Sequence, residues 1–170
     1  MAQGPGSFTG LRVGVTTAKT FAYAAKTELV GVDTLQAIAA SLPKDEPPIW
    51  SIMDAGRQQL FAARFKQQGE SLICVEPTKI LAIDQWLAGL NKADQVAGPA
   101  LESLKNRLPE HVELTDQRCW QPQAQWVGRL GWQHYLDGQR TDCWEMVPEY
   151  FRKSAAEENT EKARSSAEPS

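Results

Sequence analysis

Apolar and polar positions follow two different periods along this chain, and the two periods predict alternating helices and strands. Between residues 11 and 26, apolar side chains recur every three or four positions, which is the spacing of one helical face. Further helices are predicted at 34–42, with Thr34 as the N-cap, and at 83–90, 100–108 and 123–136. Short apolar runs predict strands at 29–32, 49–53, 60–65, 71–75 and 95–97. This order of elements predicts an α/β fold.

A polar, proline-rich connector, "LPKDEPP" at residues 42–48, is the predicted boundary between two units. We expect residues 1–45 to form a small N-terminal unit and residues 46–153 to form a larger α/β unit. In the larger unit, the strands on either side of "DAGRQQ" are expected to pair as a hairpin. Residues 154–170 contain almost no large apolar side chain, which predicts a disordered tail.

Composition excludes several classes of protein. The chain has 18 Lys and Arg against 21 Asp and Glu, so no basic excess indicates direct binding to nucleic acid. No apolar run approaches the roughly 18 residues of a membrane span, so we expect no membrane association. The three cysteines are far apart and odd in number, and they match neither a zinc site nor a disulfide framework. A cytoplasmic protein is therefore expected.

The glycine-rich turn "GPGSFTG" at residues 4–10 leads into the first helix. It is no P-loop, because no lysine follows Gly10, and no nucleophile elbow, because Pro5 stands two positions before the serine. One interpretation is a tight turn whose Ser7 or Thr9 caps the helix. The other is an anion or nucleotide phosphate held at the helix N-terminus, by a turn that contains Gly4, Gly6, Ser7 and Thr9.

Small residues recur every four positions in the first helix, at Gly10, Gly14, Ala18 and Ala22. One side of the helix is therefore nearly bare backbone, against which another helix can pack at short distance. We expect this side to be a partner interface.

Other candidate residues have a structural interpretation beside the functional one. Asp54 and Arg57 follow a strand and would either contact a ligand or partner, or form a hairpin turn in which Asp54 caps local amides. The chain's histidines, His111 and His134, are 23 positions apart, so they predict no shared metal site. Tryptophans cluster late in the chain, and without nearby basic runs we expect core or helix packing rather than stacking on RNA for Trp120, Trp126, Trp132 and Trp144.

Four segments together resemble the TsaB family: "GPGSFTGLRVGVTTAKTFAYAA", "LVGVDTLQAIA", "SIMDAGRQQLFAARF" and "VPEYFRKS". The match runs in order from Gly4 to about Lys153, although residues 66–140 agree only in pattern and length. TsaB proteins are the dimerisation subunits of the bacterial machinery that makes threonylcarbamoyladenosine in tRNA. The resemblance implies a two-lobed ASKHA-type fold, which is actin-like and RNase H-like, and similarity to the catalytic subunit TsaD and the glycoproteases.

Members of this family begin several dozen residues earlier, with an apolar strand, a second strand and a first helix. The resemblance therefore implies that the N-terminal lobe is truncated here, and that residues 1–45 are its loosely held remnant. A naturally shortened protein is the alternative.

The resemblance also implies a role without catalysis. The catalytic relative holds a metal with two histidines four apart on a helix, where this chain has Thr34 and Ile38 in "VDTLQAI". We therefore expect no catalytic residue, no metal and no cofactor of its own, while a nucleotide at the subunit boundary stays open.

The implied function is that of a noncatalytic dimerisation or scaffold subunit. Its first helix would pack against the equivalent helix of a TsaD-like catalytic subunit, which transfers a threonylcarbamoyl group to an adenosine beside the anticodon. A small ATPase subunit is the further partner, contact with tRNA is indirect, and a homodimer stays open. The alternatives are a vestigial glycoprotease-like hydrolase, a small ASKHA kinase, or a fragment without function.

Overall fold

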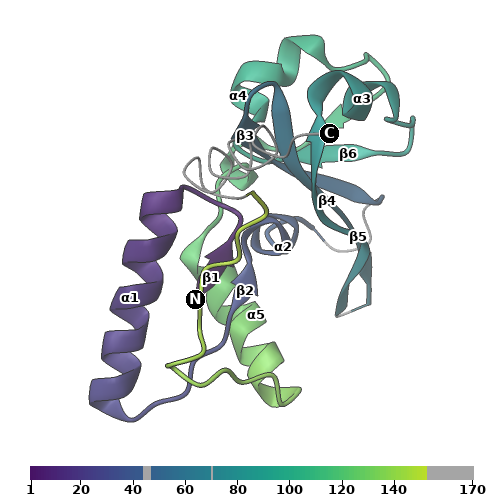
Figure 1. Cartoon of the computed structure of the whole chain (residues 1–170). Coiled ribbons are helices and arrows are strands. Elements are labelled where there is room, and N and C mark those ends of the chain that lie inside the picture. The colour runs from purple at the N-terminus through teal and green to yellow at the C-terminus, as the bar shows by residue number, and fades with distance from the viewer. Residues whose placement is uncertain (44–46, 70, 153–170) are drawn as a thin grey trace, which may run out of the picture.

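The structure is a computed structural model, and it describes residues 1–43, 47–69 and 71–152. In this part of the chain the strands form one small sheet and one large sheet (Figure 1). In the small sheet, β1 (Ala2–Gly4) pairs in parallel with β2 (Val32–Asp33). Two helices flank this pair on opposite sides, α1 (Phe8–Ala25) and α5 (Ala124–Leu136).

The large sheet has the strand order β5-β4-β3-β6-β7. Strands β3, β4 and β5 form an antiparallel meander, while β6 runs parallel to β3 and β7 runs parallel to β6. Their bounds are β3 (Ile49–Gly56), β4 (Gln59–Gln68), β5 (Ser71–Ala82), β6 (Gln95–Ala97) and β7 (Glu113–Leu114).

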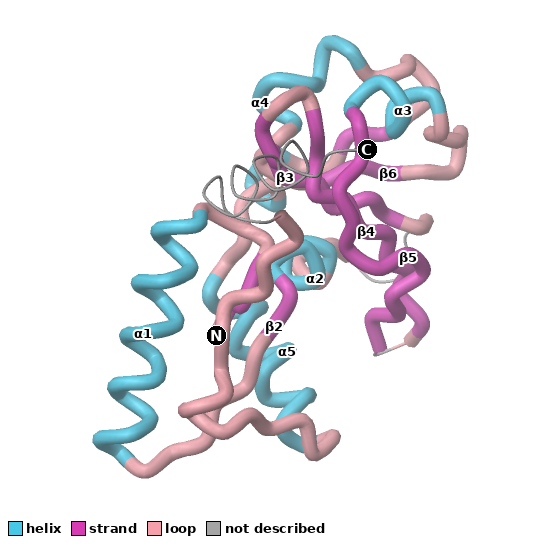
Figure 2. Tube along the Cα trace, viewed as in Figure 1, coloured by secondary structure: helices cyan, strands magenta, loops and turns pink. Residues whose placement is uncertain are grey.

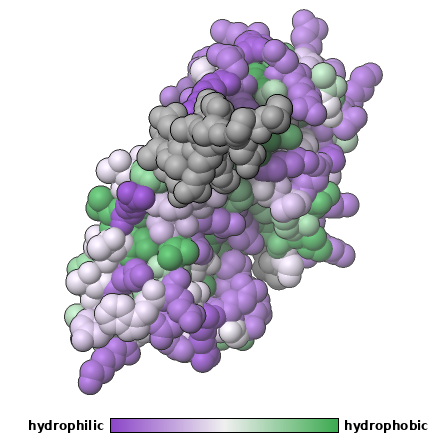
Figure 3. Space-filling model, in the orientation of Figure 1, coloured by the Kyte–Doolittle hydropathy of each residue, from purple (hydrophilic) through white to green (hydrophobic). Residues whose placement is uncertain are grey.

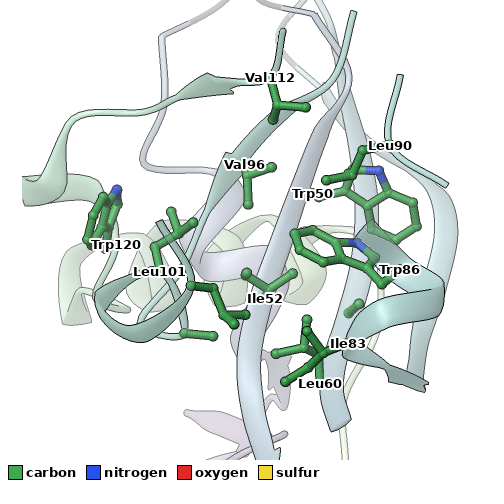
Figure 4. Close-up of a cluster of buried hydrophobic side chains, with 13 residues drawn as sticks. Trp50, Ile52, Leu60, Ile83, Trp86, Leu90, Val96, Leu101, Val112 and Trp120 are labelled. Carbon is green, nitrogen blue, oxygen red and sulfur yellow. The ribbon is translucent and has the colours of Figure 1, made fainter. Parts of the chain in front are cut away.

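Alternating side chains of the large sheet form a core on each face, as the two-residue period of a strand requires. On one face, Trp50 and Ile52 of β3 pack with α3 (Ile83–Ala88) and α4 (Leu101–Leu104), and Figure 4 shows this cluster. On the other face, Ile49 joins a second cluster with α2 (Thr34–Ala39). Helix α2, which follows the small sheet directly, is thereby fixed to the large one.

The first helix begins and ends with clear caps. Ser7 is the N-cap, and its hydroxyl accepts a hydrogen bond from the Gly10 amide at 3.3 Å. At the other end Lys26 adopts a left-handed conformation, with φ of 53°, and its amide bonds to the Ala22 and Tyr23 carbonyls. The helix therefore spans residues 8–25 rather than the expected 11–26, because the cap lies inside the glycine-rich turn.

Several expected boundaries were wrong. The N-cap of α2 is Asp33 rather than Thr34: the Asp33 carboxylate accepts from the Leu35 amide at 2.6 Å and from the Gln36 amide at 2.9 Å. A strand was expected at 29–32, but β2 comprises only Val32 and Asp33. The helix expected at 100–108 is α4 followed by a 3₁₀ turn at Lys105–Arg107. The strands β1 and β7 were not expected at all.

The largest difference concerns β5, which was expected at 71–75 and continues to Ala82. The strand pairs with β4 from Ser71 opposite Gln68 to Ala82 opposite Gln59. Its middle, Glu76–Lys79, contains a proline and two charges, which hid the strand from a search for apolar runs.

The expected α/β class and the predicted β3–β4 hairpin are confirmed. The expected tail at 154–170 lies outside the described residues, as does part of the connector, 44–46. The division into units at 1–45 and 46–153 stays a prediction. None of the described helices is long and apolar enough to cross a bilayer.

Candidate functional site

A cavity of about 620 Å³ lies between the start of α1 and the end of strand β3 in the large sheet. One wall is the turn from Pro5 to Leu11, and another is the end of β3, Met53–Ala55, with Phe61 of β4. The third wall is the segment Glu149–Arg152. Most of this lining is aromatic or aliphatic, with two carboxylates, Asp54 and Glu149.

The glycine-rich turn provides the helix cap that one interpretation predicted. Ser7 closes the first turn of α1 through its hydroxyl, and its carbonyl accepts from the Leu11 amide at 2.8 Å. Thr9 is exposed on the first turn, and Gly6 lines the cavity. Gly4 is buried with φ of +146°, and a Cβ there would lie 2.6 Å from the Glu149 carbonyl oxygen. Glycine is thus required at this position, whereas ligand binding by the turn stays a prediction.

The row of small residues on α1 does not share one environment. Gly10 and Gly14 are exposed, Ala18 is half-buried, and Ala22 is buried. The reason is geometric: four residues advance a helix by about 40° more than one full turn, so the row winds from outside to inside. A side chain added at Gly14 would meet no atom within 4 Å.

Large apolar side chains are exposed beside these two glycines. Val13 is 62% exposed and Phe21 is 71% exposed, although buried Val15 lies between them in the sequence. Figure 3 shows hydrophobic residues among pale, neutral ones on the side of the molecule where α1 lies. We call the exposed residues Gly10, Val13, Gly14, Thr17 and Phe21 the open face of α1. Sequence periodicity missed Val13 and Phe21 because it selects the buried stripe of a helix.

Asp54 and Arg57 lie in the β3–β4 hairpin, as their spacing indicated. The Asp54 carboxylate accepts from the Gly56 amide at 2.7 Å, so it does cap a local amide. It also lines the 620 Å³ cavity and a second one of about 320 Å³, where Arg57 and Arg107 are found. The hairpin places Arg57 in the left-handed region, with φ of 55°. A contact with a ligand or partner stays a prediction for both residues.

The late tryptophans are in three different environments. Trp120 is buried in the core, as expected, and Trp126 of α5 is half-buried. Trp132 and Trp144 are exposed at 62% and 68%, so neither lies in the core, although the Trp144 ring packs edge-on against Tyr23 of α1. Helix α5 packs mainly against β2 and α2, and none of its side chains is fully buried.

The two histidines contact different parts of the chain. The His134 ring lies 3.4 Å from the Gly31 carbonyl oxygen, and the His111 ring lies 3.5 Å from the Leu90 carbonyl oxygen. Within residues 1–43, 47–69 and 71–152, no three His, Cys, Asp or Glu side chains are close enough to bind a metal.

Two carboxylates near the cavity were missed in the sequence. Asp33 accepts a hydrogen bond from the Thr78 hydroxyl of β5 at 2.7 Å, in addition to capping α2. Burial raises the pKa of Asp33, and the hydrogen bonds that it accepts partly oppose this rise. Partial burial raises the pKa of Glu149, and the neighbouring Asp33 carboxylate raises it further. An Asp directly before an apolar helical run is a usual N-cap, so Asp33 could have been found.

Comparisons with known proteins agree with this geometry. The family model described as "TsaD: tRNA N6-adenosine threonylcarbamoyltransferase" matches residues 1–160. A curated relative from Bacillus subtilis (strain 168), "tRNA threonylcarbamoyladenosine biosynthesis protein TsaB", is 30% identical over 167 residues, covering 92% of this chain and 70% of its own length. The chain belongs to the TsaB family.

Two solved structures share the fold of this TsaB-family chain. One is titled "YeaZ from Pseudomonas aeruginosa", with a TM-score of 0.76, 18% identity, and coverage of 88% of this chain and 70% of that one. The other is a Pseudomonas aeruginosa protein "with similarity to peptidase YEAZ", also with a TM-score of 0.76 and 18% identity, covering 89% of this chain and 71% of that one. The ASKHA-type fold expected from the resemblance is confirmed.

The two positions where the resemblance implies histidines in a catalytic relative lie inside α2. Thr34 and Ile38 are both buried, and Ile38 belongs to the cluster that joins α2 to the large sheet. These side chains contribute to packing, and neither carries an imidazole.

Proposed function

We propose that this chain is a noncatalytic subunit of the machinery that forms threonylcarbamoyladenosine in tRNA. The name of the Bacillus subtilis relative supports a role in that biosynthesis. In this proposal the chain binds a TsaD-type catalytic subunit in the cytoplasm and holds it in its active arrangement. The small ATPase subunit joins the same assembly, and tRNA is contacted through the catalytic subunit.

The open face of α1 is the observation that carries this proposal. A Phe and a Val side chain on a surface helix each gain about 1.5–3 kcal/mol when they are fully buried. Exposed apolar side chains grouped on one element are typical of protein–protein contact. Gly10 and Gly14 beside them leave the backbone accessible, so a second helix can approach α1 closely. A second copy of this chain is the competing occupant of the face.

The lining of the 620 Å³ cavity supports a role without catalysis. Its described wall contains two side-chain hydroxyls, and both are engaged: that of Ser7 caps α1, and that of Tyr150 accepts a hydrogen bond from Arg12. Histidine, lysine and cysteine do not occur among the described residues that form the wall, which leaves the carboxylates of Asp54 and Glu149 as its basic groups, and that of Asp54 is engaged with the Gly56 amide. Thr34 and Ile38 likewise support the absence of a metal site of the TsaD kind.

A matched pair of substitutions on α1 tests the proposal. Phe21→Asp places a charge on the open face, and Thr16→Asp places the same charge on an exposed position of the other flank. We expect Phe21→Asp to abolish co-purification with the TsaD-type subunit and to lower threonylcarbamoyladenosine formation on a tRNA transcript. Thr16→Asp should retain both.

Two results would contradict the proposal. Equal binding by both variants would exclude the open face as the contact surface. Formation of the modified nucleoside, or peptide hydrolysis, by the purified chain alone would show an enzyme instead of a scaffold.

A further inference from the structure

The last nine described residues, 144–152, begin in a turn and continue without helix or strand, and we call them the strap. Figure 1 shows it in yellow-green, and Figure 2 shows it in pink as a loop, running between α1 and the small sheet toward the large sheet. Its sequence, "WEMVPEYFR", contains the third wall of the 620 Å³ cavity. The strap therefore touches three parts of the fold that are far apart in the sequence.

Its first half is bound to α1. The Lys19 ammonium donates to the Trp144 carbonyl at 3.1 Å and to the Met146 carbonyl at 3.0 Å. The Trp144 ring lies edge-on to the Tyr23 ring, with centroids 5.2 Å apart. Met146 itself is only 1% exposed, so this half is anchored by a buried side chain as well as by hydrogen bonds.

The middle of the strap lies beside β1. The Glu149 amide donates to the Gln3 carbonyl at 2.9 Å, and the Gln3 side-chain amide donates to the Val147 carbonyl at 2.9 Å. These bonds place the middle of the strap alongside β1. Gly4 allows the close approach that this placement needs.

The last three residues of the strap contact both α1 and the large sheet. Tyr150 faces α1: its hydroxyl accepts from Arg12 Nε at 3.0 Å, and its ring lies 5.0 Å from the Phe8 ring. Arg152 faces the large sheet, where it donates to the Ala55 carbonyl at 2.7 Å and to the Gln59 side chain. The Phe151 ring lies 6.1 Å from that of Phe61 in β4.

We propose that the strap is a positioning device, which holds α1 in one orientation relative to the large sheet. The reason is the cavity: at its N-terminal end α1 faces 620 Å³ of open space, and the strap crosses this gap with a charged anchor on each side. Tyr150 is the positioning residue toward α1, and Arg152 is the positioning residue toward the sheet.

One consequence rests on the proposed function. A partner that contacts both the open face of α1 and neighbouring surface needs α1 in a single orientation. If the competent orientation falls to about one tenth of the population, the apparent Kd for that partner rises about tenfold. The strap would thus act on partner affinity without touching the partner.

The experiment measures orientation directly in the full chain. Spin labels are introduced through non-canonical amino acids at Thr20 of α1 and Lys66 of β4, both exposed. We expect a single narrow distance distribution for the wild type and a broad one for Arg152→Gln. The control is Arg140→Gln, which removes an arginine that lies outside the strap and pairs with Glu28 at 3.5 Å. It should leave the distribution narrow.

Binding and folding are separated by further measurements. A narrow distribution in folded Arg152→Gln overturns the strap proposal, whatever the affinity for the TsaD-type subunit. A broad distribution, combined with wild-type binding by Phe21→Asp, supports the strap and refutes the proposed function. Should Arg152→Gln fail to fold, Tyr150→Phe removes only the hydroxyl that Arg12 contacts. An unchanged distribution in that variant would also overturn the proposal.

Discussion

Gly14→Leu should raise the free energy of unfolding of the isolated chain and lower its affinity for the TsaD-type subunit. Because the two effects have opposite signs, this substitution is the most informative one. Glycine inside a helix costs about 1 kcal/mol relative to alanine, and leucine costs only a few tenths. The added side chain would meet nothing within 4 Å, so no clash offsets this gain. We expect the free energy of unfolding of the isolated chain to rise by about 0.5–0.8 kcal/mol.

The same side chain would stand between α1 and a helix packed closely on the open face. Overpacking a tight contact costs about 1–3 kcal/mol. The Kd for the TsaD-type subunit should therefore rise by a factor of about 5 to 150. Titration calorimetry measures this change, and urea unfolding of the isolated variant measures the first one.

Ala22→Leu is the matched control, because Ala22 belongs to the same row of small residues but is buried against its own chain. It should destabilise the isolated chain by about 1–3 kcal/mol. If Gly14→Leu folds stably and binds the TsaD-type subunit as tightly as the wild type, close helix packing at Gly14 is refuted. If Gly14→Leu instead lowered the stability of the isolated chain, the statement that position 14 is open to solvent would be wrong.

Two further predictions concern buried carboxylates. The folded-state pKa of Asp33 is raised, so its contribution to stability is complete below its unfolded pKa and is lost as pH rises through the folded value. The stability of the wild type should therefore fall as pH rises above the ordinary range of an Asp carboxyl, and Asp33→Asn should flatten this profile in urea unfolding at stepped pH. An equal slope in the variant would refute the assignment. Asp94, 1% exposed, pairs with Arg64 and accepts from the Asn91 amide at 2.9 Å, so Asp94→Ala should cost roughly 2–4 kcal/mol, less than a fully buried pair because Arg64 is partly solvated. A loss below 1 kcal/mol in thermal unfolding would show that the pair behaves as a surface ion pair.

Local signals in the sequence determined the class of the fold and the kind of most elements. Periods of two and of three to four residues report which face of a strand or helix is buried, and they are written in neighbouring residues. For this reason the α/β order, the β3–β4 hairpin and the presence of a helix at α3 followed from the chain alone. The glycine-rich turn before α1 carried both the helix cap and the family resemblance.

Contacts between distant residues were decided only by the tertiary structure. The extension of β5 to Ala82 depends on pairing with Gln59, and no local pattern records such a partner. The same holds for Asp33, whose helix-capping role is local but whose bond to Thr78 joins two sheets. The strap is the clearest case, because Arg12 and Tyr150 are 138 positions apart.

The candidate partner surface on α1 shows most clearly what the sequence determined and what the tertiary structure decided. The sequence determined that α1 has a row of small residues, since their spacing is a local property. It could not determine which of them face outward, because a row with a spacing of four winds around the helix by about 40° per step. Only the packing of Val15 and Ala22 against the rest of the chain sets the rotation of α1 about its axis. That rotation leaves Gly14 and Phe21 in the open and buries Ala22.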